Sequence, residues 1–290
     1  EVVSYFRWRQ APFAQEQMHA GLLRPDNAPA PGLAEARLVA EELSQMPDVE
    51  QTRAPVALIF DYASDWSWSV LRQGADFTYF GLMMDAYRGL RRLGLSVDIL
   101  PSSTTDLSPY ALVLAPGLAS VPTALADALG STLALIGPRS NAVTPELTIP
   151  TPLGPNLPGL DATVARVESL PPGITRPVSG GGAIHRWSED LEGRAEVILA
   201  TEAGDPVMMR SGMTSYLGGW PDDALWQRIL LALCAEAGLD TTILPEGVRI
   251  RDGKNFTYAF NYNSEDSVIK GEKIPAAGVR WWPRQPRAKA

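Results

Sequence analysis

From residue 55 onward, short runs of consecutive apolar residues alternate with longer segments in which apolar residues recur at helical spacing. A strand that is apolar on both faces is typical of a parallel sheet covered by helices on both sides. The pattern therefore predicts an α/β fold with a doubly wound parallel sheet. The strands are expected at 56–61 (VALIFD), 96–100, 110–115 (YALVLA) and 132–137, and the helices between them at 77–93 and 122–129.

The sequence after this alternation is less regular. Residues 138–177 are rich in proline and are predicted to be irregular. Beyond them we expect short strands at 183–187, 195–201 and 206–210, and a last amphipathic helix at 222–237, which Gly238 ends.

The two ends of the chain have patterns of their own. We expect a strand over residues 1–9, with bulky side chains on both faces, and an amphipathic helix over 32–46 that Pro47 ends. Because the sequence lacks an initiating Met and opens in mid-strand, we expect it to begin inside a longer chain. Near the C-terminus, Asp252-Gly253 marks a hairpin turn, and aromatic residues alternate with smaller ones along 255–262. This pattern predicts a small antiparallel sheet.

Composition and charge exclude several classes of protein. The formal net charge is −8 and the pI is near 4.9, which argues against nucleic acid and against an anionic membrane surface as partners. The longest apolar runs fall far short of the roughly 20 residues that a membrane span needs. Cys234 is the single cysteine, so we expect neither an intramolecular disulfide nor a cysteine zinc cluster, and a reducing, cytoplasmic location. No motif for a cofactor is found, so none is expected.

Glu16 and His19, in the loop after the first predicted strand, form the most interesting candidate site. Residues three apart on a helical turn face the same way, so this pair could bind a metal ion or hydrogen-bond a polar ligand. A di-metal site of this type needs a second such motif, and the other histidine, His185, has a different sequence context. We therefore expect no metal, and the pair either satisfies the loop backbone or binds a polar ligand.

Three further features each have a functional and a structural interpretation. Residues 61–68 follow the carboxyl end of a strand, where open α/β sheets bind ligands, so Trp66 and Trp68 could stack on a sugar or simply pack a loop or an interface. The glycine run 180–182 is interpreted as a turn, because it lacks the glycine pattern and the helix of a dinucleotide site. Cys234 lies on an apolar helix face with no histidine near it in sequence, so we expect it in the core and not as a nucleophile.

Several segments, taken in order, carry a resemblance to a known family. The first is YFRWRQAPF at 5–13 with Glu16-Gln17-Met18-His19, and the others are 56–68, 98–100, 106–110 (DLSPY), 137–140 (GPRS) and 216–221 (YLGGWP). Together they resemble the bacterial β-galactosidases of glycoside hydrolase family 42, over essentially the whole chain. The first segment resembles the end of the family's catalytic barrel.

This resemblance implies three parts and a sugar-binding role. Residues 1–50 look like the last βα unit of a (β/α)₈ barrel. Residues 51–245 look like a flavodoxin-like trimerisation domain, akin to class I glutamine amidotransferases but without their chemistry, and residues 246–290 look like a small antiparallel β domain. The family's E-x-x-H segment holds galactose hydroxyls, and both of its positions match Glu16 and His19. The role suits a carboxylate, which accepts hydrogen bonds, and a neutral imidazole, which can donate or accept one.

The resemblance also implies that the catalytic residues lie elsewhere. Retaining glycosidases use two carboxyls about 5 Å apart, and in this family both are glutamates on earlier barrel strands, before residue 1 here. No catalytic residue is therefore expected in this chain, and the family's cysteine zinc cluster is also upstream. The first hypothesis is the C-terminal portion of a homotrimeric enzyme that hydrolyses terminal β-D-galactosides. The alternatives are a non-catalytic oligomerisation module and, with less support, an amidotransferase-like domain.

Overall fold

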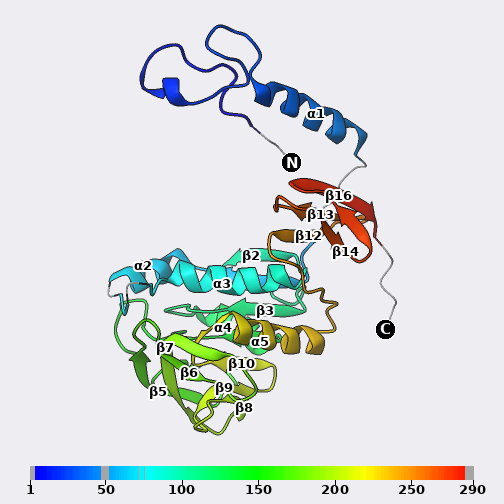
Figure 1. The fold of residues 1–290 in the computed structure, drawn as a ribbon. Helices are drawn as coiled ribbons and strands as arrows, with labels where there is room; N and C mark the ends of the chain where they lie inside the picture. Colours follow the sequence, from blue (N-terminus) through cyan, green and yellow to red (C-terminus); the bar gives the residue numbers. More distant parts are fainter. Residues whose placement is uncertain (1–3, 47–51, 71, 75, 285–290) are drawn as a thin grey trace. The chain divides into compact units, whose positions relative to one another are not determined.

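The computed structural model describes residues 4–46, 52–70, 72–74 and 76–284 (Figure 1). The chain divides into two compact units, Glu1–Glu50 and Gln51–Ala290, each of which is described by itself. No helix in the described ranges is long and apolar enough to cross a membrane.

The first unit contains a short 3₁₀ helix, η1 (Gln15–Met18), and one long helix, α1 (Pro31–Gln45). The helix predicted at 32–46 is thereby confirmed, while Pro47 lies outside the described residues. Along α1 the buried side chain is Leu33.

The strand predicted over residues 1–9 is wrong for the part that the structure describes. Residues 4–8 form no strand, and Arg9 makes an isolated parallel bridge to Leu23. Leu23 N donates to Trp8 O at 2.8 Å, and Gln10 N donates to Leu23 O at 2.9 Å. An extended segment becomes a strand only where a neighbour offers a continuous ladder of hydrogen bonds. Within residues 4–46 that neighbour is the short segment around Leu23.

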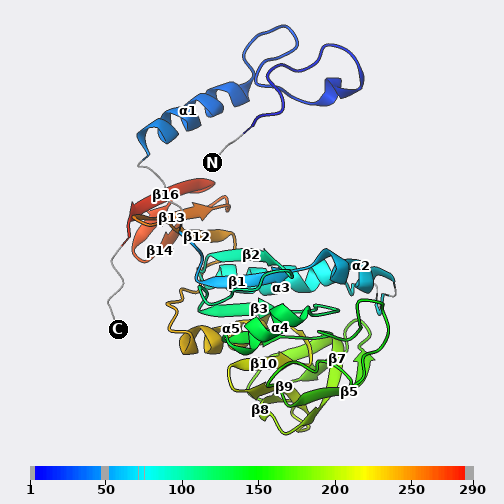
Figure 2. The same ribbon diagram turned by 180° about the vertical axis from the view of Figure 1, so that it is seen from behind.

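The second unit is built on a seven-stranded sheet with the order β2-β1-β3-β4-β10-β9-β8 (Figure 2). Neighbouring strands from β2 to β10 are parallel, and β9 pairs antiparallel with both β10 and β8. All four strands predicted from apolar runs lie in the parallel part. The bounds are β1 (Val56–Phe60), β2 (Val97–Pro101), β3 (Leu112–Ala115), β4 (Ala134–Ile136), β8 (Glu196–Ala200), β9 (Pro206–Ser211) and β10 (Thr214–Leu217).

The helices of this unit pack along the sheet and begin at capping side chains. α3 and α5 lie side by side, and a Cβ added at Gly89 of α3 would lie 2.6 Å from a methyl carbon of Leu230 (Figure 1). The side chain of Thr78 accepts a hydrogen bond from Gly81 N at the start of α3, and Asp222 accepts one from Leu225 N at the start of α5. The bounds are α2 (Tyr62–Val70), α3 (Tyr79–Arg92), α4 (Thr123–Gly130) and α5 (Asp223–Glu236).

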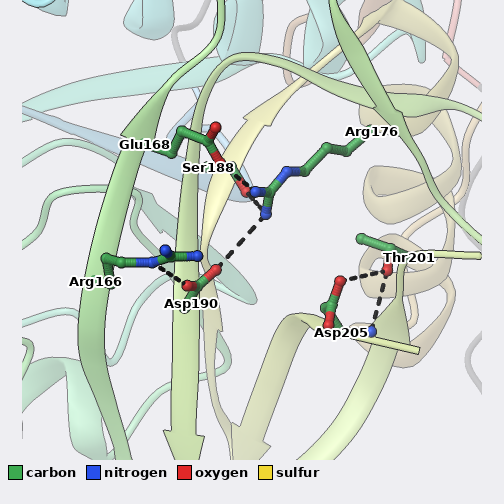
Figure 3. A network of polar contacts seen from close by, with 7 residues as sticks. All are labelled: Arg166, Glu168, Arg176, Ser188, Asp190, Thr201 and Asp205. Atoms are coloured by element: carbon green, nitrogen blue, oxygen red, sulfur yellow. Dashed lines mark hydrogen bonds and ion pairs between the residues drawn. The ribbon is translucent and has the colours of Figure 1, made fainter. Parts of the chain in front are cut away.

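A second sheet has the order β11-β7-β5, with β6 also paired to β7. Residues 138–177 were expected to be irregular, and this is wrong for β5 and β6. Both strands pair with β7, which lies further along the chain, and pairing with a distant segment leaves no local pattern in the sequence. Arg176 of β6 forms ion pairs with strands on the same sheet, with Glu168 of β5 and with Asp190 of β7 (Figure 3). The bounds are β5 (Ala162–Ser169), β6 (Thr175–Pro177), β7 (Ala183–Gly193) and β11 (Gly219–Pro221).

The C-terminal residues form antiparallel sheets. The strands β12 and β13 flank Asp252-Gly253 and form the predicted hairpin, which β16 extends to three strands. β14 and β15 form a separate pair. Arg91 of α3 donates to Ile250 O at 3.0 Å, which joins the three-stranded sheet to the helix. The bounds are β12 (Val248–Asp252), β13 (Phe256–Asn261), β14 (Ser267–Ile269), β15 (Glu272–Ile274) and β16 (Gly278–Pro283).

Candidate functional site

Glu16 and His19 lie at an exposed turn of the first unit. Glu16 is inside η1, and His19 follows its last residue. His19 N donates to Glu16 O at 3.0 Å, so the backbone closes one turn between them. The two side chains therefore come from one short turn, as their spacing predicted.

Arg7 forms an ion pair with Glu16. Its Nη1 lies 3.3 Å from Glu16 Oε2 and also donates to Glu16 O at 3.5 Å. The Glu16 side chain keeps 54% of its surface exposed, against 27% for Arg7. Sequence reasoning did not foresee this ion pair, because it joins positions nine residues apart through an irregular loop.

His19 is placed by an aromatic neighbour. The Phe6 ring meets the His19 ring edge to face, with their centroids 6.0 Å apart. No hydrogen bond joins the side chains of Glu16 and His19 within the described part of the chain. The turn thus presents an acceptor and an imidazole to solvent, which is the pairing that sugar hydroxyls need. Among the described residues, no three histidine, cysteine, aspartate or glutamate side chains come together as a metal site would need.

A small cavity lies at the carboxyl end of β1, beside a network of hydrogen bonds around Asp61. The carboxylate of Asp61 accepts hydrogen bonds from the backbone and hydroxyl of Ser64 at 2.7 Å and from the Ser102 hydroxyl at 2.8 Å. These residues line a cavity of about 280 Å³. Trp68 is buried and stacks on Phe77, with ring centroids 4.7 Å apart, so it offers no surface to a sugar. Trp66 is 65% exposed.

Two other features have the structural role that the sequence analysis favoured. Cys234 is fully buried in α5, and burial raises the pKa of its thiol to about 11, which disfavours the nucleophilic thiolate. The glycines 180–182 all have positive φ angles and form a turn closed by Val178 N donating to Gly182 O at 2.9 Å. The strand β7, not a helix, follows this turn.

Sequence reasoning missed a buried polar cluster between the two sheets. Glu189 of β7 accepts three hydrogen bonds: from Trp187 Nε1 at 2.9 Å, from Arg139 N at 2.8 Å and from the Tyr216 hydroxyl at 2.8 Å. Burial raises the pKa of the Glu189 carboxyl, against the lowering effect of these donors and of the Arg139 charge. The one local signal was Gly137-Pro138-Arg139-Ser140 directly after a buried strand.

Comparison with known proteins shows two successive sequence profiles along the chain. One described as "Beta-galactosidase" matches residues 1–46, and one described as "Beta-galactosidase trimerisation domain" matches residues 54–240. The β-galactosidase of Thermus thermophilus is 45% identical over 274 residues, which cover 91% of this chain and 42% of that protein. The β-galactosidase Bga of Halorubrum lacusprofundi is 32% identical over 303 residues, which cover 91% of this chain and 42% of that protein.

Solved structures agree with the profiles. The β-galactosidase from the psychrophilic Marinomonas ef1 aligns with a TM-score of 0.90 at 37% identity, over 97% of this chain and 47% of that chain. The enzyme from Bacillus circulans sp. alkalophilus aligns with a TM-score of 0.86 at 20% identity, over 97% of this chain and 49% of that chain, and shows the fold alone.

The chain shares its α/β fold with several sheets with a solved β-galactosidase, so its fold is that of a part of a glycoside hydrolase. Since the trimerisation profile alone matches more than half of its residues, the chain belongs to the family 42 β-galactosidases. It spans about 42% of the length of the curated relatives that it matches.

Proposed function

We propose that this chain is the C-terminal portion of a retaining β-galactosidase that hydrolyses terminal β-D-galactosides. The observation that carries the proposal is the succession of the two profiles along one chain, the β-galactosidase profile first and the trimerisation-domain profile after it. The curated relatives that match over 91% of this chain are themselves named β-galactosidases.

Within this proposal the chain has three parts. Residues 1–50 are the last βα unit of a (β/α)₈ barrel, residues 51–245 a flavodoxin-like trimerisation domain, and residues 246–290 a small antiparallel β domain. The parallel order β2-β1-β3-β4-β10 supports the middle assignment, because it is the strand order of flavodoxin-like sheets. The division of the chain near residue 50 supports the first boundary.

Glu16 and His19 are proposed to hold galactose hydroxyls. Arg7 keeps the Glu16 carboxylate in place, which lets its oxygens accept hydrogen bonds from a sugar without first becoming ordered. His19 can donate or accept according to its tautomer. Neither residue supplies the chemistry: a retaining mechanism needs an acid/base and a nucleophilic carboxyl about 5 Å apart, and we assign no catalytic residue to this chain.

The chain is also proposed to form a homotrimer through residues 51–245, because the profile that matches residues 54–240 is that of a trimerisation domain. A non-catalytic assembly module remains the second candidate, supported by the same profile. The amidotransferase-like alternative loses support, because Cys234 is buried in a helix and its pKa is raised. A single, buried cysteine also suits the reducing cytoplasm that we propose as the location.

A domain-joining experiment tests the enzymatic proposal. The 290-residue chain alone should not hydrolyse a nitrophenyl β-galactoside, since without two positioned carboxyls it lacks most of the ~8–23 kcal/mol by which enzymes lower a barrier. Joining it to the part of the Thermus thermophilus β-galactosidase that precedes the matched region should restore turnover. The upstream part expressed without this chain is the control. Turnover by the isolated chain, or a folded chimera as inactive as the upstream part, would contradict the proposal.

A further inference from the structure

A cavity at the carboxyl end of β4 combines apolar walls with the charged side chain of Arg139. It has a volume of about 450 Å³ and lies between the loop after β4 and the strands β5, β7 and β10. The carboxyl ends of parallel strands are where open α/β sheets bind ligands. Its walls are mostly aliphatic side chains, among them Val143, Ile149, Leu153, Val164 and Val167.

Arg139 supplies the positive charge at the cavity. Its guanidinium lies over three aromatic rings, 5.0 Å from the centroid of Trp68, 5.8 Å from Phe77 and 5.2 Å from Trp187. Its Nη1 is buried and has no hydrogen-bond partner, and no carboxylate pairs with the guanidinium among the described ion pairs. A guanidinium that is partly removed from water without an ion pair of its own is costly to keep.

The backbone at this position is also unusual. Arg139 has a φ of 56°, in the left-handed region that non-glycine residues rarely occupy. Gly137, two residues earlier, could be no other residue, because a Cβ there would lie 2.4 Å from Leu217 O. The loop is thus held tightly against β10, and it places the Arg139 side chain at the cavity in spite of the strain. Backbone strain of this kind is found preferentially at functional sites.

Glu189 also lines the cavity and compensates the Arg139 charge only in part, because the two charges interact but no ion pair joins the two side chains among the described residues. Its recorded contact with Arg139 is to the backbone N–H, and its oxygens are already engaged by Trp187 and Tyr216. Three donors around one carboxylate disperse its charge and leave it little capacity for a further donor. A cationic ligand therefore finds little acceptor capacity there, while an anionic ligand finds a guanidinium whose charge is only partly compensated and whose Nη1 has no hydrogen-bond partner.

We propose that this cavity binds a small organic carboxylate with an apolar body. The carboxylate pairs with the Arg139 guanidinium, and the body replaces water along the valine and leucine walls. The site is separate from Glu16 and His19, and its existence does not depend on the proposed galactosidase activity.

Phenylacetate is a suitable probe, titrated into the full 290-residue chain with tryptophan fluorescence as the readout, because Trp68 and Trp187 border Arg139. We expect saturable binding of one molecule per chain. Phenylacetamide and benzylammonium, which lack the negative charge, should bind at least about tenfold more weakly. No saturation up to about 10 mM, or equal binding of the amide, would overturn the proposal.

Substitutions test whether the Arg139 guanidinium is the group that binds the carboxylate. Arg139→Met should weaken phenylacetate binding about tenfold or more, whereas Arg139→Lys should retain part of it. Arg194→Met is the matched control, because that side chain is 92% exposed, pairs with Asp161 and is not part of the cavity lining. Unchanged affinity in a folded Arg139→Met chain would refute the assignment.

A second pair of variants covers the case in which Arg139→Met does not fold. Leu153 lines the cavity and is 47% exposed, so it tolerates a charged side chain. Leu153→Glu and Leu153→Lys remove the same apolar surface and differ in the sign of the added charge. Phenylacetate should bind more weakly to the Glu variant than to the Lys variant, whereas equal affinities would show that charge does not govern the site.

Discussion

The carboxyl of Glu189 illustrates how single residues set the properties of this fold. It is buried, and its three hydrogen-bond partners are all donors. Because burial raises its pKa in the folded chain above the ordinary value of 4.5, the folded state holds this proton more tightly than the unfolded state does. The resulting contribution to stability is complete below the ordinary pKa and decreases as the pH rises through the raised one.

Glu189→Gln should abolish this part of the pH dependence. The amide oxygen can accept from Trp187 and from the backbone of Arg139, and the amide nitrogen can donate to the Tyr216 hydroxyl. Urea midpoints between about pH 5 and about pH 8 should fall less in the variant than in the parent chain. Glu192→Gln, an exposed position on the same strand, is the control that should change nothing. Identical pH profiles for Glu189→Gln and the parent would contradict this account.

Glu16 and His19 give a second prediction at the residue scale, measured in the active chimera. Glu16→Gln and His19→Ala should each lower kcat/KM for a β-galactoside, because each loses polar contacts to the sugar. The loss should correspond to about 1–3 kcal/mol in the activation free energy that kcat/KM reports. The melting temperature should stay unchanged, because both side chains are exposed. Met18→Ala, an 87% exposed neighbour in the same turn, should leave both quantities as they are. A variant that loses stability together with activity would favour a structural role in the loop.

At the scale of elements, the sequence predicts what is encoded locally and misses what depends on distant partners. The four buried parallel strands follow from apolar runs, whereas β5 becomes a strand only by pairing with β7. The helix α2 was missed because its serines and tryptophans have low helix propensity, although Asp61 capping the backbone of Ser64 was a usable signal. On α3, helical spacing puts Phe80 on the same face as the buried Met83, yet Phe80 is 58% exposed. The spacing of apolar residues therefore locates the buried face of a helix only to within one residue position.

The candidate sites divide in the same way. The pair Glu16 and His19 is local, three residues apart, and sequence spacing found it. Arg139 and Glu189 are 50 residues apart and meet only because the loop after β4 lies against β7. No periodicity or motif within one segment could have joined them.

The start of α5 offers a prediction for an element. This helix carries Leu225, Trp226, Ile229 and Leu230 into the core, and Asp222 caps it by accepting from Leu225 N at 2.8 Å. Asp222→Ala should lower the free energy of unfolding by about 0.5–2 kcal/mol, whereas Asp222→Asn, an equally good cap, should cost much less. Urea denaturation of the two variants measures the difference. Equal losses would mean that the negative charge of Asp222, and not its capping hydrogen bond, stabilises the helix.

At the scale of the whole molecule, an exposed apolar stripe on α2 is the best candidate for a subunit contact. Tyr62, Trp66 and Val70 follow one another at four-residue spacing, so they lie on one face of the helix, and all three are more than 60% exposed. Aromatic side chains left in water on a helix face mark interaction surfaces more often than isolated apolar residues do. The matching trimerisation profile covers this helix.

We therefore expect the 290-residue chain to scatter light as a particle of three times 31.3 kDa, a ring closed by cyclic symmetry. Trp66→Glu should convert it to monomers at micromolar concentration, because three buried carboxylates without partners would each cost several kcal/mol. Leu43→Glu, at an apolar position of α1 that is 55% exposed, is the control that should leave the mass unchanged. A monomeric parent chain would mean that residues 51–245 do not carry the trimer contact by themselves. A trimer that persists in Trp66→Glu would place the contact on a surface other than α2.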